Sequence, residues 1–404
     1  MRRWLRWHLR RPGFNNSLRR VFSTSHGVDS VDVRCGASGH VTIDLHNFSR
    51  LKHDEPILIH LPPLPANPST QSQLPRFLQG LPVASIRFRW EGLSRPPYPA
   101  LLDTSKGGTE PRAEWPTPVH DTAFAFSWLR DSFTPEKQGR RSVYVYGSFV
   151  GASLATSLAL TEAHPHSRFA VRGFMAYNGI YNWTMFLPDH RINRPATRAG
   201  RNFIPPQPKA GSHLHFLQEQ MPGLFGHPTH LFDAFASPAL FFHSPGLIVP
   251  QSFTMSVAET TAIDSMMGKE TEPAYAVKTP RKSHFIFPPR QSTLKIPEAL
   301  LLHDSSPIPL TASGKPSRRK SKASGNSFET QSAELVALMR RSIEVVELKD
   351  RCKWDDDILD LADESRRRVQ LMNVGEGTSD YEMSAAGEAA ALRWLKEREL
   401  AGDR

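Results

Sequence analysis

The sequence predicts an α/β domain with a mostly parallel central sheet and helices on both of its faces. Two observations predict it. Apolar runs of strand length alternate with segments whose apolar residues recur at helical spacing, and their order repeats strand, helix, strand. The clearest instance is residues 142–177, where a strand, a glycine-flanked turn, a small-residue helix and a second strand follow one another. A helix between two strands returns the chain to the same edge of the sheet, which makes the strands parallel.

Each element has its own sequence signal. The strands are short runs rich in β-branched and aromatic residues, and most of them end near glycine or proline. In chain order, the expected strands cover residues 32–34, 40–45, 56–61, 81–90, 142–146, 169–177, 297–304 and 368–374. The expected helices cover residues 117–133, 150–163, 328–348 and 384–400. The first two strands are predicted to form a hairpin, because a short glycine-containing segment joins them.

Particular residues mark where these elements begin and end. The run Pro56–Leu61 is almost entirely apolar, which is typical of a strand buried on both faces, and Pro62 ends it. Asp121 lies near the start of the first long helix, as expected for an acidic residue in a first turn. The helix over 328–348 is amphipathic. The helix over 384–400 is rich in Ala, Leu, Glu and Arg, which have high helix propensity.

The chain of 404 residues is long enough to bury a large core. We expect a basic, transit-like segment over 1–30, an α/β domain over 31–375 and a C-terminal helix within 376–404. Inside the domain, residues 187–235 carry few periodic apolar residues at first and are expected to form a cap insertion. Residues 311–327 are rich in Ser, Lys and Arg, which predicts a flexible basic loop.

The formal net charge of +10 is unevenly distributed. Seven arginines precede the first acidic residue, Asp29, and without them the charge is 10 − 7, or +3. An Arg-rich, acid-free N-terminus with interleaved Trp and Leu is typical of a mitochondrial transit peptide, and Arg20–Ser25 resembles a two-step matrix processing site. We therefore expect a mitochondrial matrix protein. The alternative is a cytoplasmic protein whose basic tail targets nothing.

Other classes of protein are disfavoured by composition. The two cysteines, Cys35 and Cys352, argue against a disulfide-stapled secreted domain and a cysteine zinc site. No run approaches the roughly 20 apolar residues that span a bilayer, so no transmembrane segment is expected. Without clustered cysteines or carboxylates, the histidines of the cap are expected to be solvated loop residues rather than metal ligands. These are His213, His215, His227 and His230. We expect neither a metal nor a cofactor.

The most informative motif follows the strand over 142–146. Gly147-Ser148-Phe149-Val150-Gly151 keeps both glycines of the Gly-x-Ser-x-Gly nucleophile elbow, but Phe149 holds the position of the serine. A phenyl ring has no lone pair to attack a carbonyl and no proton to give to a base. The motif therefore predicts the strand, turn and helix of an elbow without its nucleophile.

With this motif the chain resembles the α/β-hydrolases, specifically the esterase/lipase branch called hydrolase fold-3, over roughly residues 30–375. Three stretches carry the resemblance, and all precede residue 160. They are Ile57–Pro63 with Val83–Trp90 in the position of the central strands, Trp115–Leu129 as the family's Pro-x-x-x-x-Asp-x-x-x-Ala-x-x-Trp-Leu helix entry, and the elbow continuing into Leu154–Ala159. The resemblance implies the α/β-hydrolase fold with a cap. It also implies ester hydrolysis by a serine, a histidine and an acid.

Several positions depart from the pattern that the resemblance implies. Where the family has His-Gly-Gly-Gly for its oxyanion hole, the sequence has His60-Leu61-Pro62-Pro63, and proline has no N–H to donate. The acid should precede the helix that begins at Phe328, either as Asp304 or within Gly325-Asn326-Ser327. The base should follow the last strand, but no histidine occurs after His303.

These departures favour a catalytically degenerate hydrolase-fold protein whose retained cleft binds a small ligand or a protein partner. One alternative is an active serine carboxylesterase or lipase-like hydrolase that uses Ser148 or Ser153. Against it, Ser148 precedes the tip of the elbow, Ser153 follows it, and serine is common at helix starts. A second alternative is an interaction protein that binds RNA through the basic loop. The lack of interleaved aromatic residues in that loop argues against nucleic acid.

Overall fold

The structure is a computed structural model of the chain. It describes residues 28–52, 55–65, 72–92, 113–135, 139–193, 212–267, 279–305, 325–349, 361–375 and 381–402. Several expected features lie wholly or partly outside the described residues. They are the transit-like segment up to residue 27, part of the cap over 194–211, the basic loop up to residue 324, and Cys352.

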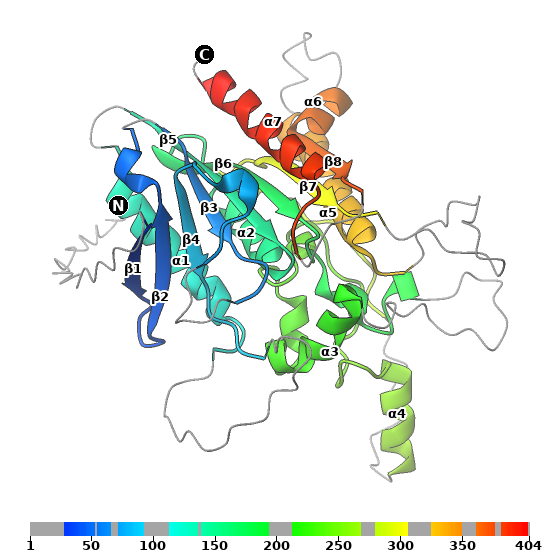
Figure 1. The fold of residues 1–404 in the computed structure, drawn as a ribbon. Helices are drawn as coiled ribbons and strands as arrows, with labels where there is room; N and C mark the ends of the chain where they lie inside the picture. The colour runs from blue at the N-terminus through cyan, green and yellow to red at the C-terminus, as the bar shows by residue number, and fades with distance from the viewer. Residues whose placement is uncertain are drawn as a thin grey trace, which may run out of the picture.

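Eight strands form one sheet in the order β1-β2-β4-β3-β5-β6-β7-β8 (Figure 1). β2 is antiparallel to both of its neighbours, and every pair from β4 to β8 is parallel. The strands are β1 (Val28–Arg34), β2 (His40–His46), β3 (Ile57–Leu61), β4 (Val83–Arg87), β5 (Arg141–Ser148), β6 (Phe169–Tyr177), β7 (Glu298–His303) and β8 (Val369–Asn373). The mostly parallel sheet predicted from the sequence is confirmed.

Helices cover both faces of this sheet (Figure 1). α1 (Thr117–Phe133), α2 (Val150–Glu162) and α5 (Phe328–Ser342) share a buried apolar cluster with one face. α7 (Ala385–Gly402) and the short 3-10 helix η2 (Arg76–Leu78) share a second cluster with the other face. β5 contributes to both clusters, because side chains of a strand alternate between faces: Val143 and Val145 join the first cluster, and Tyr144 and Tyr146 join the second.

Every strand and helix expected from the sequence is present, with shifts of a few residues at the ends. Within the described residues, three α-helices lack a counterpart in the sequence prediction: α3 (His213–Phe225), α4 (Val257–Met266) and α6 (Leu361–Arg368). α4 has no buried residue and therefore no apolar stripe for periodicity to detect. It does have a capping box, in which the backbone N–H of Glu259 donates to Ser256 and the Glu259 carboxylate accepts from Ser256 in return.

Two buried carboxylates, those of Asp44 and Asp121, form hydrogen bonds that connect β2 and α1 to adjacent segments of the chain. Asp44 on β2 accepts hydrogen bonds from Arg87 Nε at 2.7 Å, from Ser30 Oγ at 2.6 Å and from the backbone N–H of Ser72 at 3.1 Å. Burial alone would raise the pKa of Asp44, but these hydrogen bonds outweigh it and hold the pKa below its ordinary value. Asp121 on α1 accepts from the N–H of Arg89 at 2.8 Å in the same manner.

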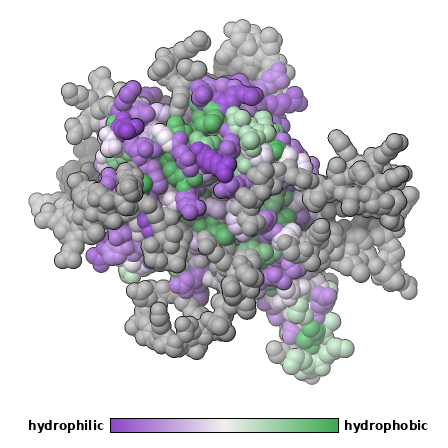
Figure 2. Space-filling view, viewed as in Figure 1, coloured by the Kyte–Doolittle hydropathy of each residue, from purple (hydrophilic) through white to green (hydrophobic). Residues whose placement is uncertain are grey.

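α4 projects away from the sheet at the lower right of Figure 1. Its C-terminal end is apolar and open to solvent, because the side chain of Met266 is 88% exposed and that of Met267 is 72% exposed. The space-filling view shows this projection as a mixture of hydrophobic and hydrophilic surface (Figure 2). Among the described residues, no helix combines the length and the apolar character needed to cross a bilayer.

Candidate functional site

A sharp turn lies at the carboxyl end of β5, where Phe149 alone separates the strand from α2. Its backbone has φ 55° and ψ −118°, which is an outlier for a bulky residue. A backbone held in such a region costs about 1–3 kcal/mol and persists only where the surrounding structure imposes it. The N–H of Phe149 donates to the carbonyl of Tyr177 at 3.0 Å, which fixes the turn against the end of β6.

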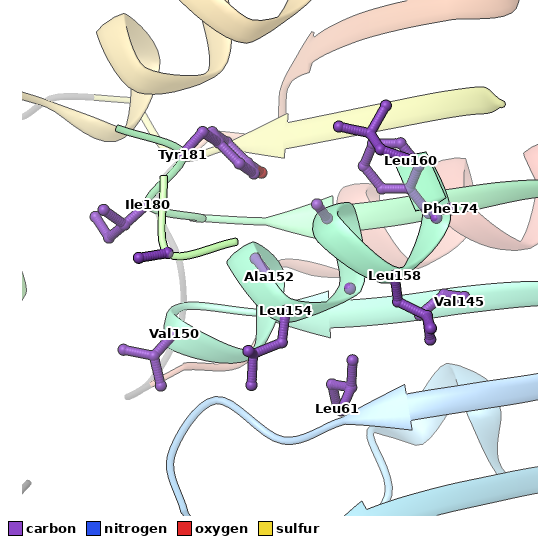
Figure 3. Packing of buried hydrophobic residues seen from close by; sticks show 14 of the residues in the cluster. Leu61, Val145, Val150, Ala152, Leu154, Leu158, Leu160, Phe174, Ile180 and Tyr181 are labelled. Atoms are coloured by element: carbon purple, nitrogen blue, oxygen red, sulfur yellow. The ribbon is translucent and has the colours of Figure 1, made fainter. Parts of the chain in front are cut away.

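Two glycines permit this turn because neither position has room for a side chain. A Cβ on Gly147 would overlap the backbone carbonyl of Gly151. A Cβ on Gly151 would in turn overlap the carbonyls of Leu61 and Pro62 at the end of β3. Figure 3 shows Leu154, from the first turns of α2, pointing toward Leu61 in this tightly packed region.

The sheet order and the turn together decide the fold. A mostly parallel eight-stranded sheet, antiparallel only at its second strand, ends its fifth strand in a strained turn that leads directly into a helix. This is the nucleophile-elbow architecture. The chain has the α/β-hydrolase fold.

The amide that would hold an oxyanion in this hydrolase fold is already bonded. One oxyanion donor is the N–H of the residue after the nucleophile, and another comes from the loop after the third strand. Here the N–H of Val150 donates to the carbonyl of Pro63 at 3.3 Å. Pro62 and Pro63, which follow β3, have no N–H. The N–H of Val150 is therefore engaged, and Pro62 and Pro63 have no N–H to offer a substrate carbonyl.

At the elbow tip, the Phe149 ring is only 2% exposed and lies among three other rings. Its centroid is 4.9 Å from that of Tyr381, 5.8 Å from that of His213 and 6.1 Å from that of Phe328. The Tyr381 and His213 centroids are also 4.9 Å apart. These rings come from the segment after β8, from α3 and from the start of α5. All three are only half-buried.

An imidazole therefore does reach the elbow tip, although from an unexpected element. His213 was expected to be a solvated residue of the cap, but it is half-buried at the start of α3 and packs edge-to-face against Phe149. The Phe149 side chain has no hydroxyl for it to deprotonate. No sequence signal places His213 or Tyr381 here, because both positions depend on how distant segments pack.

The two alternative nucleophiles lie on either side of the elbow tip, and both are buried. Ser148 ends β5 on the same face as Tyr146, opposite α2. Ser153 lies in α2, where its Oγ donates to the carbonyl of Val150 at 2.8 Å. Ser148 thus faces away from the elbow helix and Ser153 is bonded within that helix, and neither arrangement supplies the base contact that activation requires.

Asp304 occupies the expected acid position directly after β7. Its carboxylate accepts hydrogen bonds from the Tyr177 hydroxyl at 2.7 Å and from Asn178 Nδ2 at 2.8 Å. Burial, followed by the neighbouring Asp304, raises the pKa of Tyr177, so this hydroxyl stays protonated as a donor. The nearby His303 ring instead meets a backbone oxygen, since its Nδ1 lies 2.9 Å from the carbonyl of Asp304. The acid is thus bonded to the end of β6 and not to an imidazole.

The other expected acid position, Gly325–Ser327, forms the start of α5. Ser327 is the N-cap, and its Oγ accepts from the backbone N–H of Thr330 at 3.1 Å. Asn326 accepts from Gln331 Nε2 at 2.9 Å. The side chains of Asn326 and Ser327 therefore form hydrogen bonds at the start of α5. These bonds explain why Asn and Ser occupy the two positions, and no catalytic role is needed.

His60 lies inside the sheet on β3, between Ile59 and Leu61, which face the α2 side. Its own ring therefore faces the opposite side, where it stacks on Tyr146 with centroids 5.8 Å apart and Nδ1 lies 2.9 Å from Ser85 Oγ. Burial, assisted by His46, lowers the pKa of His60 to about 3. This histidine is consequently a neutral packing residue on the far side of the sheet from the elbow helix.

The other three histidines considered as metal ligands also have local partners. His227 Nδ1 lies 2.8 Å from Thr229 Oγ1, and His230 bonds the carbonyl of Phe225. His215 Nδ1 lies 3.6 Å from Glu219 Oε2 on the same helix. Within the part of the chain that the structure describes, no three His, Cys, Asp or Glu side chains gather in a way that could hold a metal ion.

No family model matches the sequence, and no curated protein matches it. Among solved structures, the chain is similar to carboxyl esterase 2 of the fungus Tuber melanosporum, with 10% identity, 92% of this chain and 85% of that chain covered, and a TM-score of 0.43. It is similar to an esterase of the archaeon Pyrobaculum calidifontis, with 13% identity, coverages of 93% and 83%, and a TM-score of 0.45. It is also similar to brefeldin A esterase, a bacterial homologue of human hormone-sensitive lipase, with 12% identity, coverages of 93% and 76%, and a TM-score of 0.40. At these low scores, the fold assignment rests on the sheet order and the elbow.

Proposed function

We propose that this protein is a catalytically degenerate member of the α/β-hydrolase fold that binds a ligand or a partner at its elbow and does not hydrolyse esters. The observation that carries the proposal is the side chain at the elbow tip. The backbone there keeps the strained conformation of a nucleophile, but the residue is Phe149, which can neither attack a carbonyl nor exchange a proton.

Two independent features support the same conclusion. The amide of Val150 donates to Pro63, and the carboxylate of Asp304 accepts from Tyr177 and Asn178, so the oxyanion and acid positions are both engaged in structural hydrogen bonds. Removing the serine or the histidine alone costs roughly a millionfold in kcat in a serine hydrolase. Losses at several positions together leave no single substitution that would restore the reaction.

The first experiment tests for residual serine chemistry. The purified chain is incubated with a fluorophosphonate probe and with p-nitrophenyl acetate and butyrate, beside the Ser148→Ala and Ser153→Ala variants. We expect no covalent labelling and no hydrolysis above that of heat-unfolded protein. Labelling that disappears in either variant would establish an active serine and overturn the proposal.

The second experiment tests whether the elbow region binds. Tyr381, Phe328 and His213 are half-buried around Phe149, so their rings offer an apolar surface that reaches solvent. Binding of 1-anilinonaphthalene-8-sulfonate is measured by fluorescence in the native chain and in Tyr381→Ala. A matched control is Phe124→Ala, because Phe124 is an exposed aromatic residue on α1. Saturable binding that is weakened only by the Tyr381 change supports the proposal, whereas equal binding by all three proteins contradicts it.

A further inference from the structure

A surface segment outside the elbow combines exposed apolar side chains with positive charge. In residues 281–290, Arg-Lys-Ser-His-Phe-Ile-Phe-Pro-Pro-Arg, the adjacent side chains of Phe285 and Ile286 are 52% and 56% exposed. Single exposed apolar residues are ordinary, but two large adjacent ones present a hydrophobic contact surface. We call residues 281–290 the Phe285–Ile286 segment.

The Phe285–Ile286 segment is held firmly against the body of the protein. The N–H of Phe285 donates to the carbonyl of Phe242 at 2.7 Å, and the backbones of Ser244 and Ser283 are joined by a hydrogen bond of 2.8 Å. Lys282 Nζ lies 2.8 Å from Glu334 Oε1 on α5. The next residue after Ile286, Phe287, is buried. Phe285 and Ile286 are therefore exposed on an anchored backbone, which reduces the entropy that binding would cost.

The charged side chains of the segment itself are all basic, and the acidic neighbour that they meet, Glu334, is mostly buried and paired with Lys282. The sequence contains no aspartate or glutamate between Glu272 and Glu298, while it contains Arg281, Lys282 and Arg290 within the segment. Arg341 of α5 adds charge from outside the segment. The pKa of His284 lies below its ordinary value because partial burial, followed by Arg341 and Lys282, disfavours its cation. Within the described residues, Arg281, Arg290 and Arg341 are all exposed.

We propose that the Phe285–Ile286 segment binds the surface of an anionic membrane, with Phe285 and Ile286 entering the interface and the surrounding cations contacting lipid phosphates. Peripheral membrane binding has two components: apolar side chains enter the interface, and nearby Lys and Arg side chains are attracted to anionic lipids. Charge complementarity requires an anionic partner, because neutral lipid or a basic surface would leave the cations uncompensated. The exposed apolar side chains of Phe285 and Ile286 favour a lipid surface over nucleic acid, since they can be buried in it. This inference goes beyond the proposed function and does not depend on whether the elbow is catalytic.

The test is co-sedimentation of the full chain with vesicles of phosphatidylcholine alone and of phosphatidylcholine with phosphatidylserine. We expect sedimentation only with the anionic vesicles, and at least roughly tenfold weaker binding for Phe285→Ser/Ile286→Ser, given the apolar area removed. Met266→Ser/Met267→Ser, at the last residue and the C-cap of α4, is the matched control. It removes two exposed apolar side chains from the end of a helix that carries Glu259 and Asp264 and no basic residue. This variant should bind as the native chain does.

Each other outcome contradicts the proposal. The basic N-terminus is present in the native chain and in every variant. If the native chain and Phe285→Ser/Ile286→Ser bind equally well, the vesicles are bound by another part of the chain, such as this N-terminus. If Arg281→Ser/Arg290→Ser weakens binding while the apolar change does not, the segment is an electrostatic contact for nucleic acid or an acidic protein. If the α4 control loses as much vesicle binding as Phe285→Ser/Ile286→Ser does, any exposed apolar side chain contributes and the binding is general hydrophobic adsorption. Trp fluorescence during urea unfolding checks that each variant is folded.

Discussion

Replacing Phe149 with glycine should leave the protein more stable than replacing it with alanine, which is the reverse of the usual order. Both changes remove a buried ring, and removal of a buried Phe side chain costs about 3–5 kcal/mol. Alanine keeps the strain of φ 55°, whereas glycine adopts that backbone without it.

The size of the difference follows from two opposing terms. Relief of the strained backbone is worth about 1–3 kcal/mol. The greater freedom of glycine in the unfolded chain opposes this by about 0.4–1 kcal/mol. Phe149→Gly should therefore exceed Phe149→Ala in the free energy of unfolding by about 1 kcal/mol, within limits of roughly 0 and 2.6 kcal/mol.

The assay is urea unfolding at pH 7, followed by Trp fluorescence and extrapolated linearly to water. Ala152→Gly is the matched control, because Ala152 is buried three residues later in the regular helix α2. There glycine should lower the free energy of unfolding by about 1 kcal/mol or more. If Phe149→Gly proves less stable than Phe149→Ala, the turn at Phe149 is not a strained elbow and the account of the site is wrong.

Three further predictions concern the sheet and the N-terminus. Arg87→Met should destabilise the fold by about 3–5 kcal/mol, because Asp44 then stays buried without its cation. The pKa of Asp44 is lowered in the folded protein, so its ionised carboxylate stabilises the fold above about pH 4, and this stabilisation is lost as the pH falls further. Urea unfolding at pH 7 and pH 3.5 should therefore show a smaller decrease in the free energy of unfolding for Arg87→Met than for the native chain. An equal decrease in the two proteins would contradict this. The folded pKa of His60 is lowered from 6.5 to about 3, so the unfolded chain takes up a proton first and stability should fall as pH drops through that window. His60→Asn should flatten this decline between pH 7 and pH 5, and an unchanged slope would refute the assignment. Finally, residues 1–30 fused to a fluorescent protein should carry it into mitochondria, and a cytosolic fusion would remove the targeting prediction.

Local sequence patterns were sufficient for most of the fold. The elements from β1 to α2 could be predicted because apolar runs, prolines and glycines report on the strands and turns in which they lie. α4 was missed although Ser256 and Glu259 carry a capping-box signal, because the helix buries nothing. α3 was missed because Pro222 and the surrounding irregular sequence obscured the apolar spacing of Leu214, Leu217 and Met221.

The sequence by itself determined that a phenylalanine occupies the tip of the elbow, since Phe149 lies between Gly147 and Gly151 in the chain. Only the tertiary structure decided what surrounds that ring. His213, Phe328 and Tyr381 come from three segments far apart in the chain, and the partners of Val150 and Asp304 lie on other strands or loops. Local patterns record which face a residue presents, but contacts between distant segments depend on how the helices and the sheet pack together.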